Sequence, residues 1–361
     1  MLDRLPSELV DAILRFALQG PNDFKQRSCN QQWIARLCNV STAVCKSAQS
    51  LLYKDVLLQR RQQTDSLMQT LQAKVDLAQH IRMLRVRAVD RRDYREEVSL
   101  YVEEAFTLLP LLPNLRGLCL AKIRDEELSW TDLYRIPRLE SLVLDSVEVE
   151  DVPPDFVLPH LTSLTISDDR TLPWENGEVT ALLTPAHLPS LRALSVDFEV
   201  SPAIASFAQL EMFQMLVDDA LACEGWDDEH PPLRLNVFTI DLHKSDDLSR
   251  ALQQLPPSHW RVVTSMKRSY STNAKQDLHT LSSFLASTST LPLSIHLPRD
   301  LYRAGVEGFK PYRDGVERLL RVLEERRLEV RWHDEPLEDE DKHLVSESCW
   351  RYVRELKSKE E

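Results

Sequence analysis

The stretch Leu112-Pro113-Asn114-Leu115-Arg116-Gly117-Leu118-Cys119-Leu120 carries a pattern that occurs four times along the chain. The shared form is (Leu/Ile)-Pro-x-Leu-x-x-Leu-x-(Leu/Ile/Val), and the other copies are Ile136-Pro137-Arg138-Leu139-Glu140-Ser141-Leu142-Val143-Leu144, Leu158-Pro159-His160-Leu161-Thr162-Ser163-Leu164-Thr165-Ile166 and Leu188-Pro189-Ser190-Leu191-Arg192-Ala193-Leu194-Ser195-Val196. The last three positions alternate, so both apolar side chains point to one side of a short strand. The proline ends the preceding segment and sets the entry into that strand. The pattern therefore predicts a series of short strands whose outward positions line one parallel sheet.

The prolines of the four copies lie at positions 113, 137, 159 and 189, which gives steps of 24, 22 and 30 residues. This period and the Leu-x-x-Leu-x-Leu core resemble a leucine-rich repeat. The resemblance implies an open, curved α/β stack that binds partners through its outward positions. The position that holds a buried Asn or Cys in that family is occupied by Ile123, Val147, Asp169 and Glu199. We therefore expect an irregular array, in which the usual side-chain ladder to backbone groups is absent or distorted.

Strands and helices continue to alternate on both sides of the four copies. Upstream, the sequence predicts a strand over 80–87 and a helix over 96–109. Downstream, candidate strands cover 237–242, 260–264, 293–297 and 328–332, and candidate helices cover 246–255, 276–286, 312–327 and 345–356. Such alternation is typical of a parallel sheet with right-handed crossovers. The expected fold class is therefore α/β, with a three-helix domain over 1–60 and an irregular leucine-rich-repeat-like solenoid with a parallel sheet over 61–361.

The first sixty residues predict three short helices. Pro6 suits the first turn of a helix, where its missing N–H costs nothing, and Gly20-Pro21 ends that helix. Asn30 is a candidate N-cap of the second helix and Ser41 of the third, which ends near Tyr53. Three short helices make a marginal core alone, and excess apolar surface on such a unit usually belongs to a partner.

Three sequence blocks of this region occur in order. They are Leu5-Pro6-x-Glu8-Leu9-x-x-x-Ile13-Leu14, Leu37-Cys38-x-Val40-Ser41 and Ala48-Gln49-x-Leu51-Leu52-Tyr53-x-x-Val56. Together they resemble the F-box, particularly the form common in fungal proteins, over about one-sixth of the chain. The resemblance implies docking on the Skp adaptor of a cullin-RING ubiquitin ligase. Carried over by position, the adaptor-binding residues are Leu5, Pro6, Leu9, Ile13, Leu14, Val40, Leu51, Leu52 and Tyr53.

Two alternatives stay open for this region. The same apolar side chains are also those that a three-helix core needs, and one residue can serve both roles. The sequence further departs from the F-box pattern: the segment between the first two blocks, 19–32, is long, and Val44-Cys45 stands where an aromatic residue is common. A non-catalytic leucine-rich scaffold with a degenerate F-box, not linked to ubiquitination, is therefore the second interpretation.

Composition narrows the class of protein. The net charge of −13 argues against bulk binding to nucleic acid or anionic membranes, and the acidic clusters at 224–229 and 334–341 are interpreted as solvated loops. No segment approaches the ~20 apolar residues that would span a bilayer, and the N-terminus lacks the pattern of a signal peptide. The six cysteines are scattered, with no Cys-x-x-Cys pair. We expect reduced, mostly buried thiols in a cytoplasmic or nuclear protein.

The sequence lacks the short motifs that carry common chemistries. Gly-rich phosphate loops, the Gly-x-Ser-x-Gly nucleophile motif and His-Glu-x-x-His are absent. We therefore predict a protein that is not an enzyme and needs no cofactor or metal. An enzyme with a site assembled from distant residues is a third interpretation, for which a closed pocket with converging, perturbed ionisable groups would speak.

Arginines cluster in and just after the first predicted strand of this acidic chain. Arg85 and Arg87 would point the same way from the strand, and Arg91 and Arg92 follow. These four residues are candidates for pairing with an acidic or phosphorylated segment of a protein substrate. The alternative is a solvated face balanced by neighbouring acidic residues.

Overall fold

The computed structural model divides the chain into two compact units, Met1–Leu161 and Thr162–Glu361. The expected domain boundary after residue 60 lies inside the first of these units. The structure describes residues 10, 14, 33–39, 42–87, 102–121, 127–167, 181–196, 206, 207, 209–217, 237–242, 262–265, 278, 279, 282, 283, 285–287, 294–298 and 310–333. The predicted helices over 246–255 and 345–356 lie outside the described residues.

The first unit contains a parallel sheet whose strands follow one another in chain order, which confirms the expected α/β class. Its strands are β1 (Asp55–Leu58), β2 (Met83–Arg87), β3 (Gly117–Ala121) and β5 (Ser141–Asp145). The pairing is parallel throughout, with β1 on β2, β2 on β3 and β3 on β5. The strand expected over 80–87 and those of the first two repeat copies are thereby confirmed.

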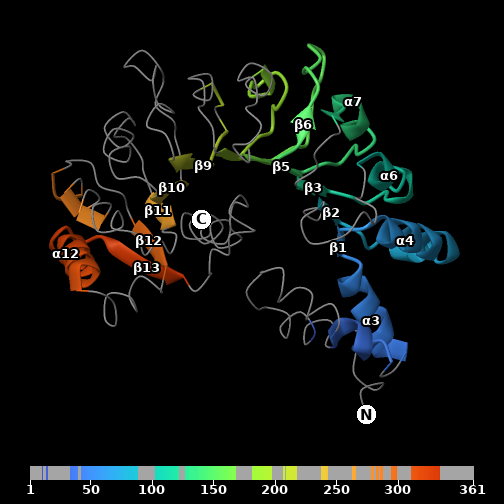
Figure 1. Ribbon diagram of the computed structural model, residues 1–361, viewed down its shortest axis with the longest axis horizontal. Helices are drawn as coiled ribbons and strands as arrows, with labels where there is room; N and C mark the ends of the chain where they lie inside the picture. Colours follow the sequence, from blue (N-terminus) through green and yellow to red (C-terminus); the bar gives the residue numbers. More distant parts are fainter. Residues whose placement is uncertain are drawn as a thin grey trace, which may run out of the picture. The chain divides into compact units, whose positions relative to one another are not determined.

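Short helices, turns and a two-residue strand connect these strands. The connecting elements are α4 (Arg61–Ala73), α5 (Val75–Ala78), α6 (Val102–Phe106), η2 (Leu109–Leu111), β4 (Glu127–Leu128) and α7 (Trp130–Leu133), and β6 (Glu148–Val149) follows β5. In this unit α4, α6 and α7 lie on one side of the strands β1, β2 and β3 (Figure 1). The helix expected over 96–109 is described from Val102 to Phe106, and a 3₁₀ turn then leads into β3. Strand β4 pairs in parallel with β6, and this pairing joins two successive connecting segments.

The core follows the alternation that the repeats predicted. Leu84, Leu118 and Leu142 stand at one register position of three neighbouring strands and are fully buried. The next inward row, Val86, Leu120 and Leu144, is buried as completely. Burying a side chain of this size contributes roughly 1.5–3 kcal/mol relative to exposure. The inward leucines of the repeat therefore hold the strands against the segments that connect them.

The strand entries are fixed by a repeated hydrogen-bond arrangement. The carbonyl oxygen of Arg82 accepts the backbone N–H groups of Arg116 and Gly117, each at 2.9 Å. One repeat later, the Arg116 carbonyl accepts those of Glu140 and Ser141, at 2.6 and 3.0 Å. Each repeat therefore sets the register of the next, because a shift by one residue would turn the inward leucines outward.

The second unit also contains parallel strands that follow one another in chain order. Its strands are β7 (Ser163–Ser167), β8 (Ala193–Val196), β9 (Met212–Val217), β10 (Val237–Leu242), β11 (Val262–Ser265), β12 (Ser294–Pro298) and β13 (Glu329–His333). All the described pairings are parallel. The strands predicted from the last two repeat copies and from the four downstream segments are confirmed, and β9 is an addition to them.

Helix α12 (Lys310–Glu325) leads into β13 through a Schellman cap. Arg327 adopts the left-handed conformation, with φ of 57°. The N–H of Leu328 donates to the carbonyl of Leu323 at 2.9 Å, and that of Arg327 to Glu324 at 3.0 Å. This is the bonding pattern that ends a helix through a left-handed residue. The helix predicted over 312–327 is confirmed, and the cap explains where it ends.

The position that holds a buried Asn or Cys in leucine-rich repeats is described by the structure in one of the four copies. Val147 is buried and apolar, so it cannot make the side-chain ladder. Ile123, Asp169 and Glu199 lie outside the described residues. A different contact joins two successive connecting segments here: the Trp130 indole Nε1 donates to the Glu150 carbonyl at 2.6 Å.

Candidate functional site

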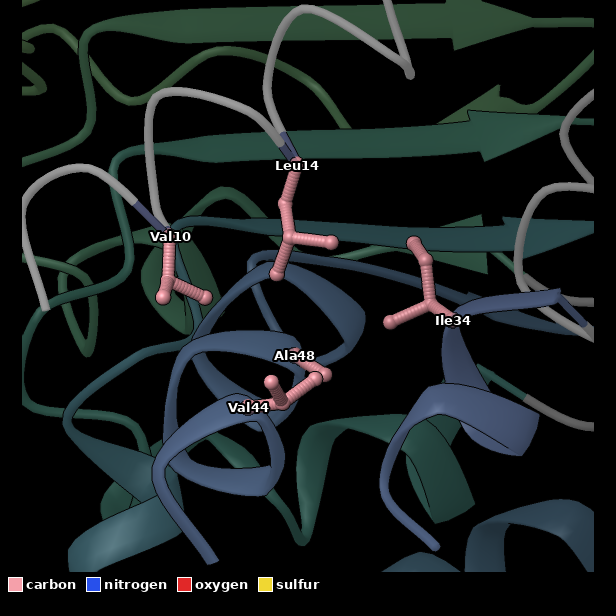
Figure 2. Packing of buried hydrophobic residues seen from close by; sticks show 5 residues of the cluster. All are labelled: Val10, Leu14, Ile34, Val44 and Ala48. Carbon is pink, nitrogen blue, oxygen red and sulfur yellow. The ribbon is translucent and has the colours of Figure 1, made fainter. Parts of the chain in front are cut away.

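The N-terminal helical segments share one apolar cluster. Its buried members are Val10, Leu14, Ile34, Val44 and Ala48. In Figure 2 Val10 and Leu14 point toward the helix that carries Val44 and Ala48, and Ile34 lies beside them. Residues from three separate segments thus form one small core, as three packed helices would need.

Helix α3 (Thr42–Leu52) supplies one wall of this cluster. Val44 and Ala48 are four residues apart, so they lie on one face of the helix and both point inward. Leu51 and Leu52 pack against the cluster while remaining partly exposed. The helix predicted to begin after Ser41 and to end near Tyr53 is confirmed.

The helix over 33–37 places its large apolar side chains in different environments. Ile34 is buried in the cluster, Leu37 is half-buried, and Trp33 is 42% exposed. An exposed tryptophan on a small helical unit offers a large apolar contact area to a partner.

The predicted adaptor-binding residues occupy different environments. Leu14 is buried in the cluster, and Leu51 and Leu52 are half-buried at its edge. Tyr53, which follows them, is half-buried as well. The remaining five, for which the prediction stands on sequence alone, lie outside the described residues: Leu5, Pro6, Leu9, Ile13 and Val40.

Cys38 packs against the edge of the same cluster, and Cys45 follows Val44 on α3. Both residues are half-buried rather than fully buried. Burial, and secondarily the neighbouring Cys45, raises the pKa of the Cys38 thiol, while the Lys74 charge acts in the opposite direction. Burial also raises the pKa of the Tyr53 phenol, with a further contribution from Cys38.

The arginine cluster is only partly described, and its first member is already engaged. Arg85 is buried, and its guanidinium pairs with Asp55 of β1. Arg87 is half-buried at the end of β2. Arg91 and Arg92 lie outside the described residues. An acidic substrate segment could therefore reach the Arg85 guanidinium only by displacing Asp55.

Comparison with known proteins adds no relative. No family model and no curated protein matches the chain. Within the ranges that the structure describes, no group of three His, Cys, Asp or Glu side chains is placed to hold a metal ion. Among those same residues, no helix is both long enough and apolar enough to cross a membrane.

Proposed function

We propose that this chain is the substrate-recognition adaptor of a Skp–cullin–F-box ubiquitin ligase. In this proposal an F-box-like helical unit docks on the Skp adaptor, and an irregular leucine-rich-repeat-like solenoid recruits a protein substrate. One observation carries the proposal: the three F-box-like sequence blocks contribute to a single apolar cluster, through Leu14, Leu37 with Cys38, and Ala48 with Leu51. The parallel strands in chain order support the solenoid part.

The proposed docking surface consists of partly exposed side chains of the same helical unit. Leu51, Leu52 and Tyr53 are half-buried and still offer apolar area. Leu14 is buried, so its proposed role is to support the surface from inside. Exposed Trp33 is added to the surface as a large apolar contact. The contacts proposed from the F-box resemblance alone are Leu5, Pro6, Leu9, Ile13 and Val40.

The proposed substrate surface is the outward side of the strands. The proposed contacts for acidic or phosphorylated residues are Arg85, Arg87, Arg91 and Arg92, and Arg85 would exchange Asp55 for the substrate. No catalytic group is required in such a protein, since its contribution is to hold the substrate close to a charged ubiquitin carrier.

The test is co-purification of the full-length chain with a Skp adaptor. The double variant Leu5→Ala/Pro6→Ala is expected to reduce adaptor capture at least tenfold, a loss of about 1.4 kcal/mol or more in binding free energy. Val75→Ala is the matched control, because Val75 is apolar and 68% exposed on α5 but lies outside the three blocks. Circular dichroism spectra of both variants establish that they remain folded.

A deletion variant separates the adaptor proposal from the scaffold alternative. A deletion that ends at Tyr53 keeps β1 and the Lys54 carbonyl, which accepts the backbone N–H groups of Arg82 and Met83 at the entry of β2. Adaptor capture by this deletion at the level of the intact chain would refute the proposed docking site. Co-purification of other partners without any Skp adaptor or cullin would favour the scaffold with a degenerate F-box.

A further inference from the structure

Strands β12 and β13 bring two histidines and an arginine to adjacent positions of the sheet in the second unit (Figure 1). Their parallel register pairs His296 with Arg331 and Pro298 with His333. Neighbouring strands lie about 4.8 Å apart, and residues two apart along one strand are separated by about 6.6 Å. His296, Arg331 and His333 therefore stand close together, although a connecting segment that includes α12 separates the two strands in sequence.

These three residues belong to the face of the sheet that is opposite the core. Followed from strand to strand, the register places Ile295 in the same row as Leu194, which is fully buried. Successive residues of a strand belong to opposite faces. His296, together with its register partner Arg331 and with His333 two positions later, therefore lies on the outward face.

The outward face of β12 differs from that of β1 in one respect that decides what it can bind. Asp55 on β1 lies diagonally opposite Arg85 on β2, and its carboxylate pairs with the Arg85 guanidinium. Ser294 on β12 holds the same diagonal position relative to Arg331. A serine hydroxyl can donate a hydrogen bond to an anion but carries no charge. Strand β12 thus supplies a donor group at the position where β1 supplies a neutralising carboxylate.

We propose that the outward face of β12 and β13 binds a single phosphate group on a segment of the recruited protein. A phosphorylated residue carries about two negative charges and three acceptor oxygens. Guanidinium is the group that binds phosphate through two parallel N–H bonds, and imidazole supplies a further N–H donor in either protonation state. Arg331, His296 and His333 together offer the donors that one such group accepts.

Other charges favour a single phosphate over a polyanion. Asp241 of β10 and Glu329 of β13 belong to the same outward face, and the chain has a net charge of −13. The repeated phosphates of a nucleic acid or an anionic membrane would be repelled by these charges. The site is an addition to the arginines over 85–92. It rests on the proposed function and deepens it, because it gives the recruited substrate a chemistry.

Retention of peptides by the immobilised full-length chain, with no Skp adaptor present, tests the proposal. The probe is a degenerate peptide library with one central phosphoserine, phosphothreonine or phosphotyrosine, and the unphosphorylated library is the reference. We expect roughly tenfold or greater preference for the phosphorylated library, because hydrogen bonds to charged groups are the stronger ones. Arg331→Gln and His296→Gln/His333→Gln should each reduce this preference severalfold. Arg331→Lys should retain an intermediate preference, since it keeps the charge but loses the two-point geometry.

A matched control separates this site from general charge effects. Arg321→Gln removes the same charge from an exposed position of α12 in the same unit and should retain the parent's preference. Circular dichroism establishes that the variants are folded, and hydrogen–deuterium exchange of peptides covering 294–298 and 329–333 should slow when phosphopeptide binds.

Three outcomes would overturn the proposal. They are an undiminished preference in Arg331→Gln, a preference that is lost in Arg87→Gln but not in Arg331→Gln, and binding of phosphoinositide vesicles without binding of phosphopeptides. Phosphopeptide binding that depends on Arg331, in a chain that captures no Skp adaptor, would support this site and refute only the proposed docking.

Discussion

Arg85 on β2 and Asp55 on β1 form a two-point ion pair, with Nε 2.9 Å from Oδ1 and Nη2 3.2 Å from Oδ2. The Arg85 side chain is only 9% exposed and that of Asp55 is 39% exposed. The register places Arg85 beside Leu57, so its guanidinium reaches back along the neighbouring strand. The pair therefore fastens the strand that leaves the helical cluster to the rest of the sheet.

Removing the Asp55 charge should destabilise this edge of the sheet. Asp55→Asn leaves a buried guanidinium without its carboxylate, and we expect a loss of about 1–3 kcal/mol in the free energy of unfolding, measured by urea denaturation. Glu140→Gln is the matched control, because the Arg116–Glu140 pair also joins successive repeats but is exposed on both sides. That variant should lose less than about 1 kcal/mol. Equal losses in the two variants would show that burial of Arg85 does not matter.

The helical cluster should respond to truncation of its core more than to loss of its exposed tryptophan. Leu14→Ala removes a buried side chain and should destabilise the cluster by about 2–4 kcal/mol, whereas Trp33→Ala should stay within about 0.5 kcal/mol. Hydrogen–deuterium exchange of peptides from α3 measures this locally. Exchange in α3 should accelerate in the first variant and remain unchanged in the second. A larger acceleration in Trp33→Ala would place the tryptophan in the core.

The repeat strands could be predicted because their inward positions alternate behind a Leu-Pro entry. Strand β9 was missed since its entry, Phe207-Ala208-Gln209-Leu210, has alanine in place of the proline. Phe207 and Leu210 are nevertheless buried like their counterparts in the other copies. The chain keeps the apolar positions that packing requires and varies the residue that only shapes the entry.

The candidate site was predictable only where it depends on local pattern. Val44 and Ala48 follow helical spacing, so α3 could be predicted from one segment. The burial of Ile34 could not, because it arises where separate segments pack together. Burial of Arg85 could not be predicted either. Its partner Asp55 lies on β1, which the sequence indicates only as the segment that follows the third helix.

The cap of α12 offers a stabilising substitution. Arg327 is exposed and held at a φ of 57°, a conformation that costs a residue with a Cβ about 1 kcal/mol or more. Arg327→Gly should therefore raise the stability of the second unit by roughly 0.5–1 kcal/mol, measured as an increase in Tm. Arg327→Val is the opposing variant and should lower Tm, because a β-branched side chain tolerates this conformation least. A decrease in Tm for both variants would contradict the assigned cap.

The reactivity of Cys38 should report the charges around it. Alkylation by iodoacetamide requires the thiolate, so a raised pKa shifts the pH–rate profile of Cys38 to higher pH than that of an ordinary cysteine. Cys45→Ser should move the midpoint down, because it removes a neighbour that disfavours the thiolate, but burial should keep it above the ordinary value. Lys74→Gln should move the midpoint up, since the lysine charge favours the thiolate. Alkylation of Cys38 is measured by mass spectrometry of the peptide that covers residues 37–46. Shifts of the same sign in both variants would show that these two neighbours do not act on Cys38 as described.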